Sequence, residues 1–333
     1  MVTVSAPPTD HTVPTVRRRS PWPGFIARRL LRLALGIVVV VTLAFLVLQL
    51  VPGDPVRLAL GPTAPVSQVN EKRAELGLDD PIMVQYVHYW QHVLTGDFGT
   101  SIVSRQKVTT IISARVGNTV TLVAVSLALT LAGAVALGMS TAALTHNNKR
   151  RWLLAGFRFT ASTLNVIPEY VYGVALVYVF AVSFALLPVA GDDGLTTLIL
   201  PSLAISLGPI AGLSRIVRVQ TVEVLGQEYI QAARSKRLSS LRIYGRHALP
   251  NLLTAALTIG GLLLGVLVAS TVVVENVFAR PGLGSTVVTA IVQRDYPVAQ
   301  SVLLLLGGAV LVVNLVVDVA LSLLDPRSLI RDS

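Results

Sequence analysis

The chain has 333 residues, of which 53% are hydrophobic and only 13% are charged, and its mean hydropathy is +0.70. A soluble globular protein of this length does not show that balance, so the composition indicates an integral membrane protein. The formal net charge is +10, and the lack of cysteine excludes disulfides and cysteine-based metal or redox sites.

The chain begins with a basic stretch that precedes the first apolar segment. Residues 1–27 are rich in proline, and residues 17–19 are all arginine, which predicts a disordered cytoplasmic tail. Arg28, Arg29 and Arg32 are expected to hold the first span at the inner lipid headgroups. The apolar run that follows is too long for a signal peptide and is not followed by a small-residue cleavage site.

Six uncharged windows follow one another along the chain, each long enough to cross a bilayer as a helix. The fold class predicted is an all-α integral membrane protein with six transmembrane helices, formed by residues 28–333. The predicted spans lie at about 30–51, 118–141, 168–188, 196–214, 250–273 and 299–323.

The cations alternate between the two sides of these spans. Lys and Arg are retained on the cytoplasmic side of a membrane when they lie in short loops. They exceed the acids in residues 1–32, 145–158 and 215–246, but not in 54–115, at Asp192 and Asp193, or in 275–295. Both termini are therefore expected to be cytoplasmic. A nucleic-acid-binding function is disfavoured, because the cations flank spans instead of forming a soluble basic domain.

The only sizeable region between spans on the outer side is residues 52–115, which we expect to be an extracytoplasmic cap. Residues 51–55 contain two prolines and a glycine, which end the first span. Short helices are expected at residues 71–78 and 81–94, and the second is closed by Gly-Asp-Phe-Gly at 96–99.

His88 and His92 stand four residues apart on the second cap helix, a spacing that zinc ligands use. No glutamate lies beside them and no third ligand is evident, so we do not predict a metal site.

The basic segment 215–249 is predicted to be a cytoplasmic loop with a helix-turn-helix form. Residues 223–237 favour a helix, and Ser239 or Ser240 is suited to cap a second one. Within it, Gln231-Ala232-Ala233, three residues, Arg237, nine residues and then His-Ala-Leu-Pro at 247–250 form a spaced pattern.

This pattern resembles the EAA loop of ABC-importer permeases, which reads E-A-A, three residues, G, nine residues, I-x-L-P. Further motifs resemble the B-type subunit of the dipeptide, oligopeptide and nickel permease family. They are Val-Pro-Gly-Asp-Pro at 51–55, Leu-Gly-Leu-Asp at 76–79, Gly-Asp-Phe-Gly at 96–99, Glu275 with Pro-Gly-Leu-Gly at 281–284, Arg-Asp-Tyr-Pro at 294–297 and Asp-Pro-Arg at 325–327.

The resemblance implies a type I ABC-importer permease fold in a bacterial plasma membrane and import of di- or oligopeptides. It implies three kinds of partner besides the lipid bilayer: a second homologous permease, two cytoplasmic ATPase domains, and an extracytoplasmic binding protein. This chain has no phosphate-binding loop, so we expect no cofactor on it, with ATP and Mg on the partner subunits. Nickel complexes and glutathione remain open as substrates.

The resemblance also assigns the ATPase-coupling residues. They are Glu223, Tyr229, Ala232, Ala233, Arg234, Lys236, Arg237, Leu238, Leu249 and Pro250. Gln231, Arg237 and His247 depart from the family pattern. A glycine at position 237 would permit a left-handed backbone that costs any other residue energy, which favours a turn moved to Ser239 and Ser240.

Other polar residues at membrane depth are candidates for the pathway or its gate. They are Asn165, Glu169, Tyr172, Glu275, Gly282, Gly284, Asp295 and Tyr296. Glu169 follows Pro168 at an expected break between an interfacial stretch and the third span, and interrupted helices often line transport pathways. The alternative is that Glu169 pairs with an internal arginine or reaches water. Asn314 and Asp318 share one face of the sixth helix and predict interhelical hydrogen bonding.

Residues 275–296 offer a last candidate element. A short amphipathic helix is expected at 285–294, too short to span and suited to dip back toward the pore as a gate. The alternative is a loop that merely joins two spans. Two other classes of function remain, a proton-coupled secondary transporter that uses Glu169 or Asp318, and an intramembrane enzyme, which the lack of paired catalytic groups disfavours.

Overall fold

The computed structural model contains only helices and their connections among the residues it describes, apart from one isolated bridge between Thr100 and Lys107. The described residues are 22–49, 54–61, 63–75, 77–145, 150–191, 194–239 and 242–324.

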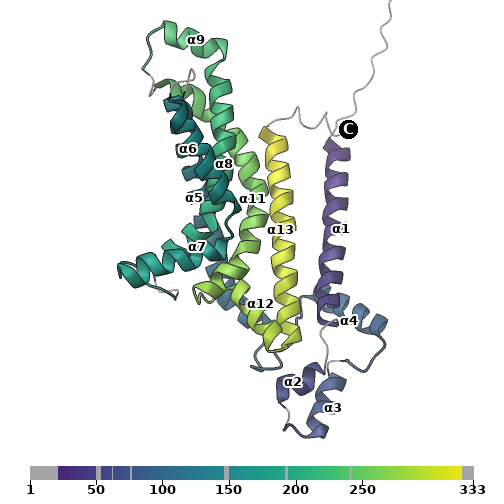
Figure 1. The fold of residues 1–333 in the computed structure, drawn as a ribbon. Helices are drawn as coiled ribbons and strands as arrows, with labels where there is room; N and C mark the ends of the chain where they lie inside the picture. The colour runs from purple at the N-terminus through teal and green to yellow at the C-terminus, as the bar shows by residue number, and fades with distance from the viewer. Residues whose placement is uncertain are drawn as a thin grey trace, which may run out of the picture.

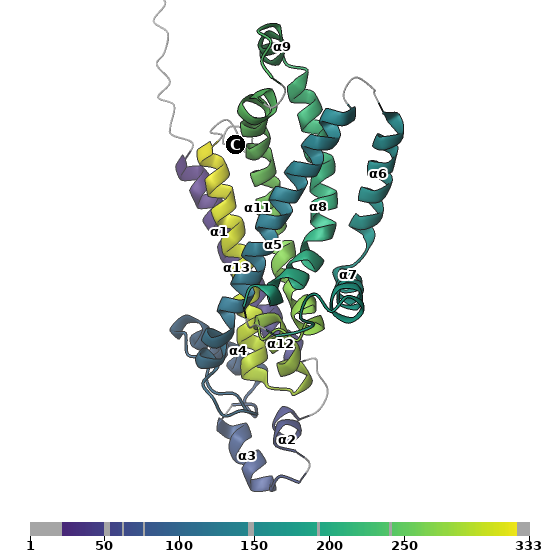
Figure 2. The same cartoon turned by 90° about the vertical axis from the view of Figure 1, so that its left-hand side faces the viewer.

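Five of the helices are long and apolar enough to cross a membrane, and a bent pair supplies a sixth candidate. The five are α1 (Trp22–Gln49), α5 (Val108–Thr145), α8 (Thr196–Leu225), α11 (Leu249–Val277) and α13 (Tyr296–Leu324). They run along one long axis (Figures 1 and 2). The predicted all-α membrane fold is confirmed.

Helices α5 and α8 form the centre of the bundle, and they pack closely because small residues lie between them. A Cβ added to Gly138 would lie 2.7 Å from the carbonyl oxygen of Ser214 and from Cβ of Val217. A Cβ added to Gly133 would lie 3.0 Å from Cδ1 of the Ile210 side chain. The backbones can approach this closely only without a side chain at these positions.

Helix α11 packs against this pair on one side and against α13 on the other. Gly260 faces Leu131 of α5, and an added Cβ on Gly261 would lie 2.3 Å from Val317 of α13. Helix α1 then packs against α13, where Gly36 meets Leu311. The glycines of α11 therefore let neighbouring helices pack closely against it.

The third predicted span, residues 168–188, is not a straight helix along the bundle. Helix α6 (Arg151–Val166) packs along α8, and α7 (Glu169–Leu176) with its π-helical continuation η2 (Val177–Ser183) is bent from it by 100°. Figure 1 shows α7 lying across the long axis. The predicted break at Pro168 is present, because proline has no amide hydrogen for a helix and disfavours helical backbone before it. Residues 151–166, expected to be interfacial, form the arm that runs along the bundle.

The cap lies at one end of the bundle, which we call the α3 end. It contains α2 (Pro55–Leu60), α3 (Val66–Glu75) and α4 (Ile82–Thr95). Helix α3 begins and ends a few residues before the predicted 71–78 helix, and α4 matches 81–94 closely. Helix α5 begins at Val108, within the region 52–115 that is predicted to be the cap and ahead of the span predicted from about 118.

Ion pairs and aromatic contacts hold the cap together and join it to α1. The Arg73 guanidinium lies 2.8 Å from the carboxylate of Asp54 and 2.7 Å from that of Asp79. Burial raises the pKa of Asp54, but hydrogen bonds from Arg73 and two backbone amides outweigh it and lower that pKa overall. Tyr86 of α4 contacts the ring of Phe45 on α1.

The opposite end of the bundle, the α9 end, carries the basic segment. Helix α8 continues to Leu225, past the predicted end of its span at residue 214, and α9 (Glu228–Ser235) follows it. The π-helical turn η3 (Ile243–Ala248) then leads into α11. The predicted helix over 223–237 is therefore broken at Gly226 and Gln227.

Candidate functional site

The α9 segment is folded onto the end of α8 by a small apolar cluster, which we call the loop core. It contains Leu225, Ile230, Ala233 and Ile243, and Leu238 and Tyr244 pack against it. Ile230 and Ala233 lie three residues apart on α9, so the helix buries one face and leaves the other exposed. Figures 1 and 2 show α9 as the element farthest out at this end.

The turn after α9 lies at Arg237, so the expectation that it had moved to Ser239 and Ser240 is wrong. Arg237 has a φ of 53°, in the left-handed region. Its amide donates to the carbonyl oxygen of Arg234 (2.8 Å), and the Leu238 amide donates to that of Ala233 (3.3 Å). This pair of bonds, with Leu238 packed near Ala233, is a Schellman motif. The contacts made by Leu238 outweigh the strain at Arg237.

Replacing Arg237 by glycine is expected to stabilise this turn, because glycine adopts a positive φ without the ~1–2 kcal/mol cost of a side chain. Arg237→Gly should raise the thermal midpoint of the purified protein slightly or leave it unchanged, while Arg237→Val should lower it. A lower midpoint for the glycine variant than for the wild type would contradict the turn assignment.

The two alanines of the EAA-like pattern have different positions. Ala233 is buried in the loop core, whereas Ala232 is exposed on the opposite side of α9. The other predicted coupling residues that lie on the outer surface of this segment are Glu223, Tyr229, Arg234, Lys236, Arg237 and Pro250, while Leu238 and Leu249 are half-buried. Gln231, where the family has an acid, donates to the carbonyl oxygen of Gly226 at 3.4 Å.

At the α3 end, a buried carboxylate holds α12 (Leu283–Val292) against the bundle. Glu275 lies within α11, not in a loop, and accepts hydrogen bonds from the Thr119 hydroxyl (2.6 Å) and the Ser285 amide (3.1 Å). The Thr119 oxygen in turn accepts from the Leu283 amide (2.8 Å). The negative charge of Glu275 thereby meets the positive end of the α12 dipole. We call these four residues the Glu275 network.

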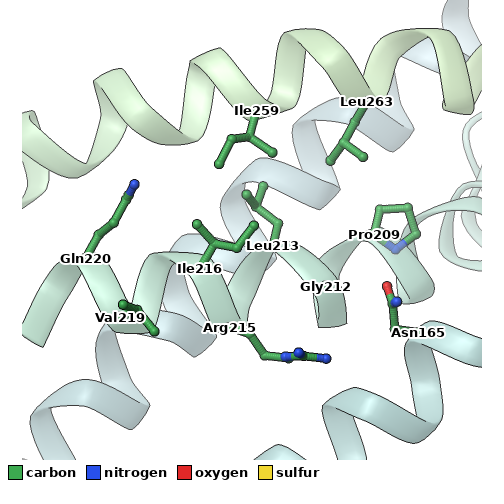
Figure 3. A pocket seen from close by; sticks show the side chains of 10 residues that line it. All are labelled: Asn165, Pro209, Gly212, Leu213, Arg215, Ile216, Val219, Gln220, Ile259 and Leu263. Atoms are coloured by element: carbon green, nitrogen blue, oxygen red, sulfur yellow. The ribbon is translucent and has the colours of Figure 1, made fainter.

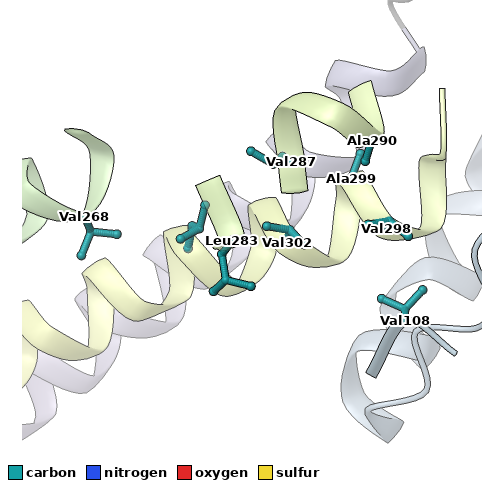
Figure 4. Close-up of a cluster of buried hydrophobic side chains, with 9 residues drawn as sticks. Val108, Val268, Leu283, Val287, Ala290, Val298, Ala299 and Val302 are labelled. Atoms are coloured by element: carbon teal, nitrogen blue, oxygen red, sulfur yellow. The ribbon is translucent and has the colours of Figure 1, made fainter. Parts of the chain in front are cut away.

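Glycines let α12 approach this carboxylate and α11. A Cβ on Gly282 would lie 2.2 Å from the Glu275 carboxylate, and one on Gly284 would lie 2.5 Å from Cα of Val272. Beside them, a buried apolar cluster joins α12 to α13 and to the start of α5 (Figure 4). It contains Val108, Val268, Leu283, Val287, Ala290, Val298, Ala299, Val302 and Leu306.

Asp295 is also buried, and it ties the turn between α12 and α13 to the segment before α5. It accepts from the Ser101 hydroxyl and from the Ile102 amide, the latter at 3.1 Å. Tyr296 beside it is half-buried against the apolar cluster. Glu275, Gly282, Gly284, Asp295 and Tyr296 therefore lie together in packed structure at the α3 end.

The other pathway candidates lie near the bend between α6 and α7. Tyr172 is buried, and its hydroxyl donates to the carbonyl oxygen of Leu164. Glu169 is half-buried in the first turn of α7, and the ion pairs found among the described residues do not include it. Asn165 is exposed and lines a cavity of about 660 Å³ with α8 and α11 (Figure 3).

At the α9 end of α13, Asp318 forms an ion pair with Arg29 of α1. Asn314 lies beside this pair at a small cavity of about 120 Å³. The pair joins the two helices, as expected of a polar contact between spans.

His88 and His92 are both exposed on α4. Within the described part of the chain, no group of three potential metal ligands is found. Sequence reasoning missed Thr119, Ser101 and the cavity residues Arg215 and Gln220. Thr119 and Ser101 carry no local signal, but an arginine followed five residues later by a glutamine just past an apolar span could have been noticed.

The sequence matches a known class of membrane protein. Residues 134–329 match the family model described as binding-protein-dependent transport system inner membrane component, and residues 24–123 match its N-terminal family. The chain belongs to this family, and it is a multi-pass plasma membrane protein and the permease subunit of an ABC importer. It is a transport subunit and not an enzyme, because ATP hydrolysis belongs to a separate subunit.

Several relatives are similar over nearly the whole chain. The glutathione transport system permease protein GsiC of Salmonella typhimurium is 36% identical over 302 residues, which cover 91% of this chain and 97% of the relative. The protein of the same name from Escherichia coli K12 is 35% identical with the same coverage. The probable peptide ABC transporter permease protein y4tP of Sinorhizobium fredii is 36% identical over 317 residues, which cover 91% and 98%.

Proposed function

We propose that this permease forms half of the translocation pathway for di- or oligopeptides, which an extracytoplasmic binding protein delivers. The second half is a homologous permease, and two cytoplasmic ATPase domains supply the energy. Relatives with peptide and glutathione transport names support this substrate class. Glutathione, itself a small peptide, is the second candidate substrate.

The observation that carries the proposal is the position of α9. Its exposed face presents Ala232, Arg234 and Lys236 beyond the end of α8, and the loop core fixes it to that helix. A displacement of α9 by the ATPase would move α8 as a rigid element, because α8 packs along α5 for most of its length. A proton-coupled transporter would have no use for such a surface.

The test is reconstitution of the complete importer with its ATPase and binding protein in liposomes. We expect uptake of a labelled tripeptide only with internal ATP and external binding protein. Uptake driven by a proton gradient without the ATPase would refute the proposal and support the secondary-transporter alternative.

Both termini and α9 are proposed to lie on the cytoplasmic side, since the cations gather at the α9 end. Reporter fusions after Asn148 and Ser240 should therefore report cytoplasm, and fusions after Gly77 and Arg280 should report the outside. An outside signal at Ser240 would overturn both the orientation and the ATPase contact.

We also propose that α12 helps close the outer end of the pathway and meets the binding protein. Thr289 is exposed on α12 and suits a thiol probe, because the chain has no other cysteine. Gly284 does not suit one, because a Cβ there meets backbone. Thr289→Cys should label at different rates in resting and ATP-trapped importers. Equal rates would leave α12 a packed connection without a gating role.

A further inference from the structure

The cavity between α6, α8 and α11 combines a mainly apolar lining with three polar side chains, those of Asn165, Arg215 and Gln220. Its volume is about 660 Å³, within the ~300–1,000 Å³ range of small-molecule sites. The walls come from Asn165 of α6, from Ile259 and Leu263 of α11, and from seven residues of α8 between Pro209 and Gln220. Figure 3 shows Arg215 pointing toward the α6 side and Gln220 toward the α11 side.

Arg215 brings a positive charge into this cavity without a carboxylate to balance it. The residues that line the cavity include no Asp or Glu, and none of the ion pairs among the described residues involves Arg215. Among the described residues, its side chain makes one long hydrogen bond of 3.4 Å, to the Ser162 hydroxyl. A guanidinium has five N–H donors, so most of its capacity is left for a ligand.

Arg215 is exposed on α8, one residue past the predicted end of its span, and it lines the cavity from the α9 end of the bundle. It lies ten residues before the end of α8 at Leu225, or ~15 Å along the helix axis. Helix α8 is also the most buried of the five long spans. Charged side chains at membrane depth or at the end of a span usually face a water-filled cavity, and such residues often mark substrate pathways.

Gln220 adds a second, complementary group. Its Oε1 is buried and has no hydrogen-bond partner among the described residues. A buried acceptor of this kind needs a hydrogen-bond donor, because a buried acceptor without a hydrogen bond costs ~1–3 kcal/mol of stability. The cavity therefore offers a cationic donor for an anion and a neutral acceptor for an N–H group.

We propose that this cavity is a cargo-binding station in the pathway, in which Arg215 binds a carboxylate of the peptide and Gln220 accepts one of its N–H groups. A peptide carries both groups, and the apolar side chains of Ile216, Ile259 and Leu263 receive the rest of it. A bare divalent cation would find no carboxylate in this lining. The inference rests on the proposed function and narrows it to cargo that carries a carboxylate.

The first experiment compares a tripeptide that has a free carboxylate with the same peptide as a C-terminal amide. Both are supplied at concentrations that saturate the binding protein, so that delivery does not limit uptake by the reconstituted importer. We expect the wild type to import the acid about ten-fold faster or more, the loss typical of one charge-assisted hydrogen bond. Arg215→Gln should lower uptake of the acid to that of the amide and leave the amide unchanged, while Arg215→Lys should retain part of the preference.

Arg28→Gln is the matched control, because it removes an exposed cation from α1, away from the cavity. It should keep the preference for the acid. If Arg215→Gln also keeps that preference, the proposal that the cavity binds the carboxylate of the cargo is wrong. If Arg215→Gln lowers uptake of both peptides equally, Arg215 contacts the second permease or supports the fold, which also refutes the proposal. If only the anionic lipid content of the liposomes changes the effect, Arg215 binds a lipid phosphate instead.

A second experiment does not depend on transport. Val219 lines the cavity and is 61% exposed, so Val219→Cys gives a single accessible thiol. The free-acid peptide should slow maleimide labelling of this thiol in the purified complex, and the amide should not. A thiol at Val316 of α13, 60% exposed and away from the cavity, should show no protection. If the peptide does not slow labelling at position 219, the proposed cargo site is refuted even where peptide uptake is intact. If the peptide does slow labelling, the proposed site is supported even where uptake fails.

Discussion

Ala232→Trp is expected to abolish ATP-dependent uptake by the complete importer while this chain remains folded. Ala232 is exposed on the outer face of α9, so an indole there does not disturb the loop core. We expect it to keep α9 from seating against the ATPase, where small side chains allow close approach. Binding of the ATPase should weaken at least ten-fold, which corresponds to about 1.4 kcal/mol. Uptake in liposomes and retention of the ATPase on pull-down measure the effect.

The controls separate docking from folding. Ala232→Ser changes little volume and should keep full uptake. Ala114→Trp makes the same large change at an exposed alanine near the start of α5, at the α3 end, and should leave ATPase binding unchanged. Normal uptake and normal ATPase retention with Ala232→Trp would refute the assignment of α9 as the coupling surface.

The same substitution at Ala233 would not distinguish a lost ATPase contact from a damaged loop. The Ala233 side chain is 7% exposed and packs in the loop core with Ile230 and Ile243. An indole there would overfill the cluster and push α9 away from α8, since overpacking a core costs ~1–3 kcal/mol. Ala233→Trp should therefore lower the thermal midpoint of this subunit alone. Loss of uptake in this variant would report a damaged loop, not a lost contact.

Much of the bundle could be predicted from the sequence, because long apolar runs and helix breakers are local signals. The break at Pro168, helix α4 and helix α12 all lie where composition and turn residues placed them. The direction of the chain after Pro168 could not be predicted, because apolarity does not say whether a segment continues along the bundle or bends by 100°. The outcome depends on packing against other helices.

The polar contacts at the α3 end show what local patterns cannot provide. Glu275 meets Thr119 across 156 positions of sequence, and Asp295 meets Ser101 across 194. Such pairs depend on the register in which helices pack, and periodicity does not fix that register. The position of the turn at Arg237 could not be predicted for another reason. The backbone preference of a single residue does not reveal the apolar contact of Leu238 that offsets the strain at Arg237.

Gly284→Ala is expected to separate α12 from α11 and to lower ATP-dependent uptake at least ten-fold. The new Cβ would lie 2.5 Å from Cα of Val272 and 2.8 Å from the carbonyl oxygen of Thr271. Both are backbone atoms, so no side-chain rotation can relieve the clash, and α12 itself must move. That movement would pull the Ser285 amide away from the Glu275 carboxylate and leave a buried charge with fewer hydrogen bonds, which costs several kcal/mol. The thermal midpoint should fall together with uptake.

Gly308→Ala is the matched control, because it makes the same change in a long helix where an added Cβ meets nothing within 4 Å. It should leave uptake unchanged and stabilise the protein by ~0.4–1 kcal/mol, because alanine restricts the unfolded chain. Equal uptake and equal midpoints in the two variants would contradict the close approach of α12 to α11. If instead Gly284→Ala lowers uptake while its midpoint stays at that of Gly308→Ala, the position of α12 acts on transport without acting on stability, as a gate at the outer end of the pathway requires.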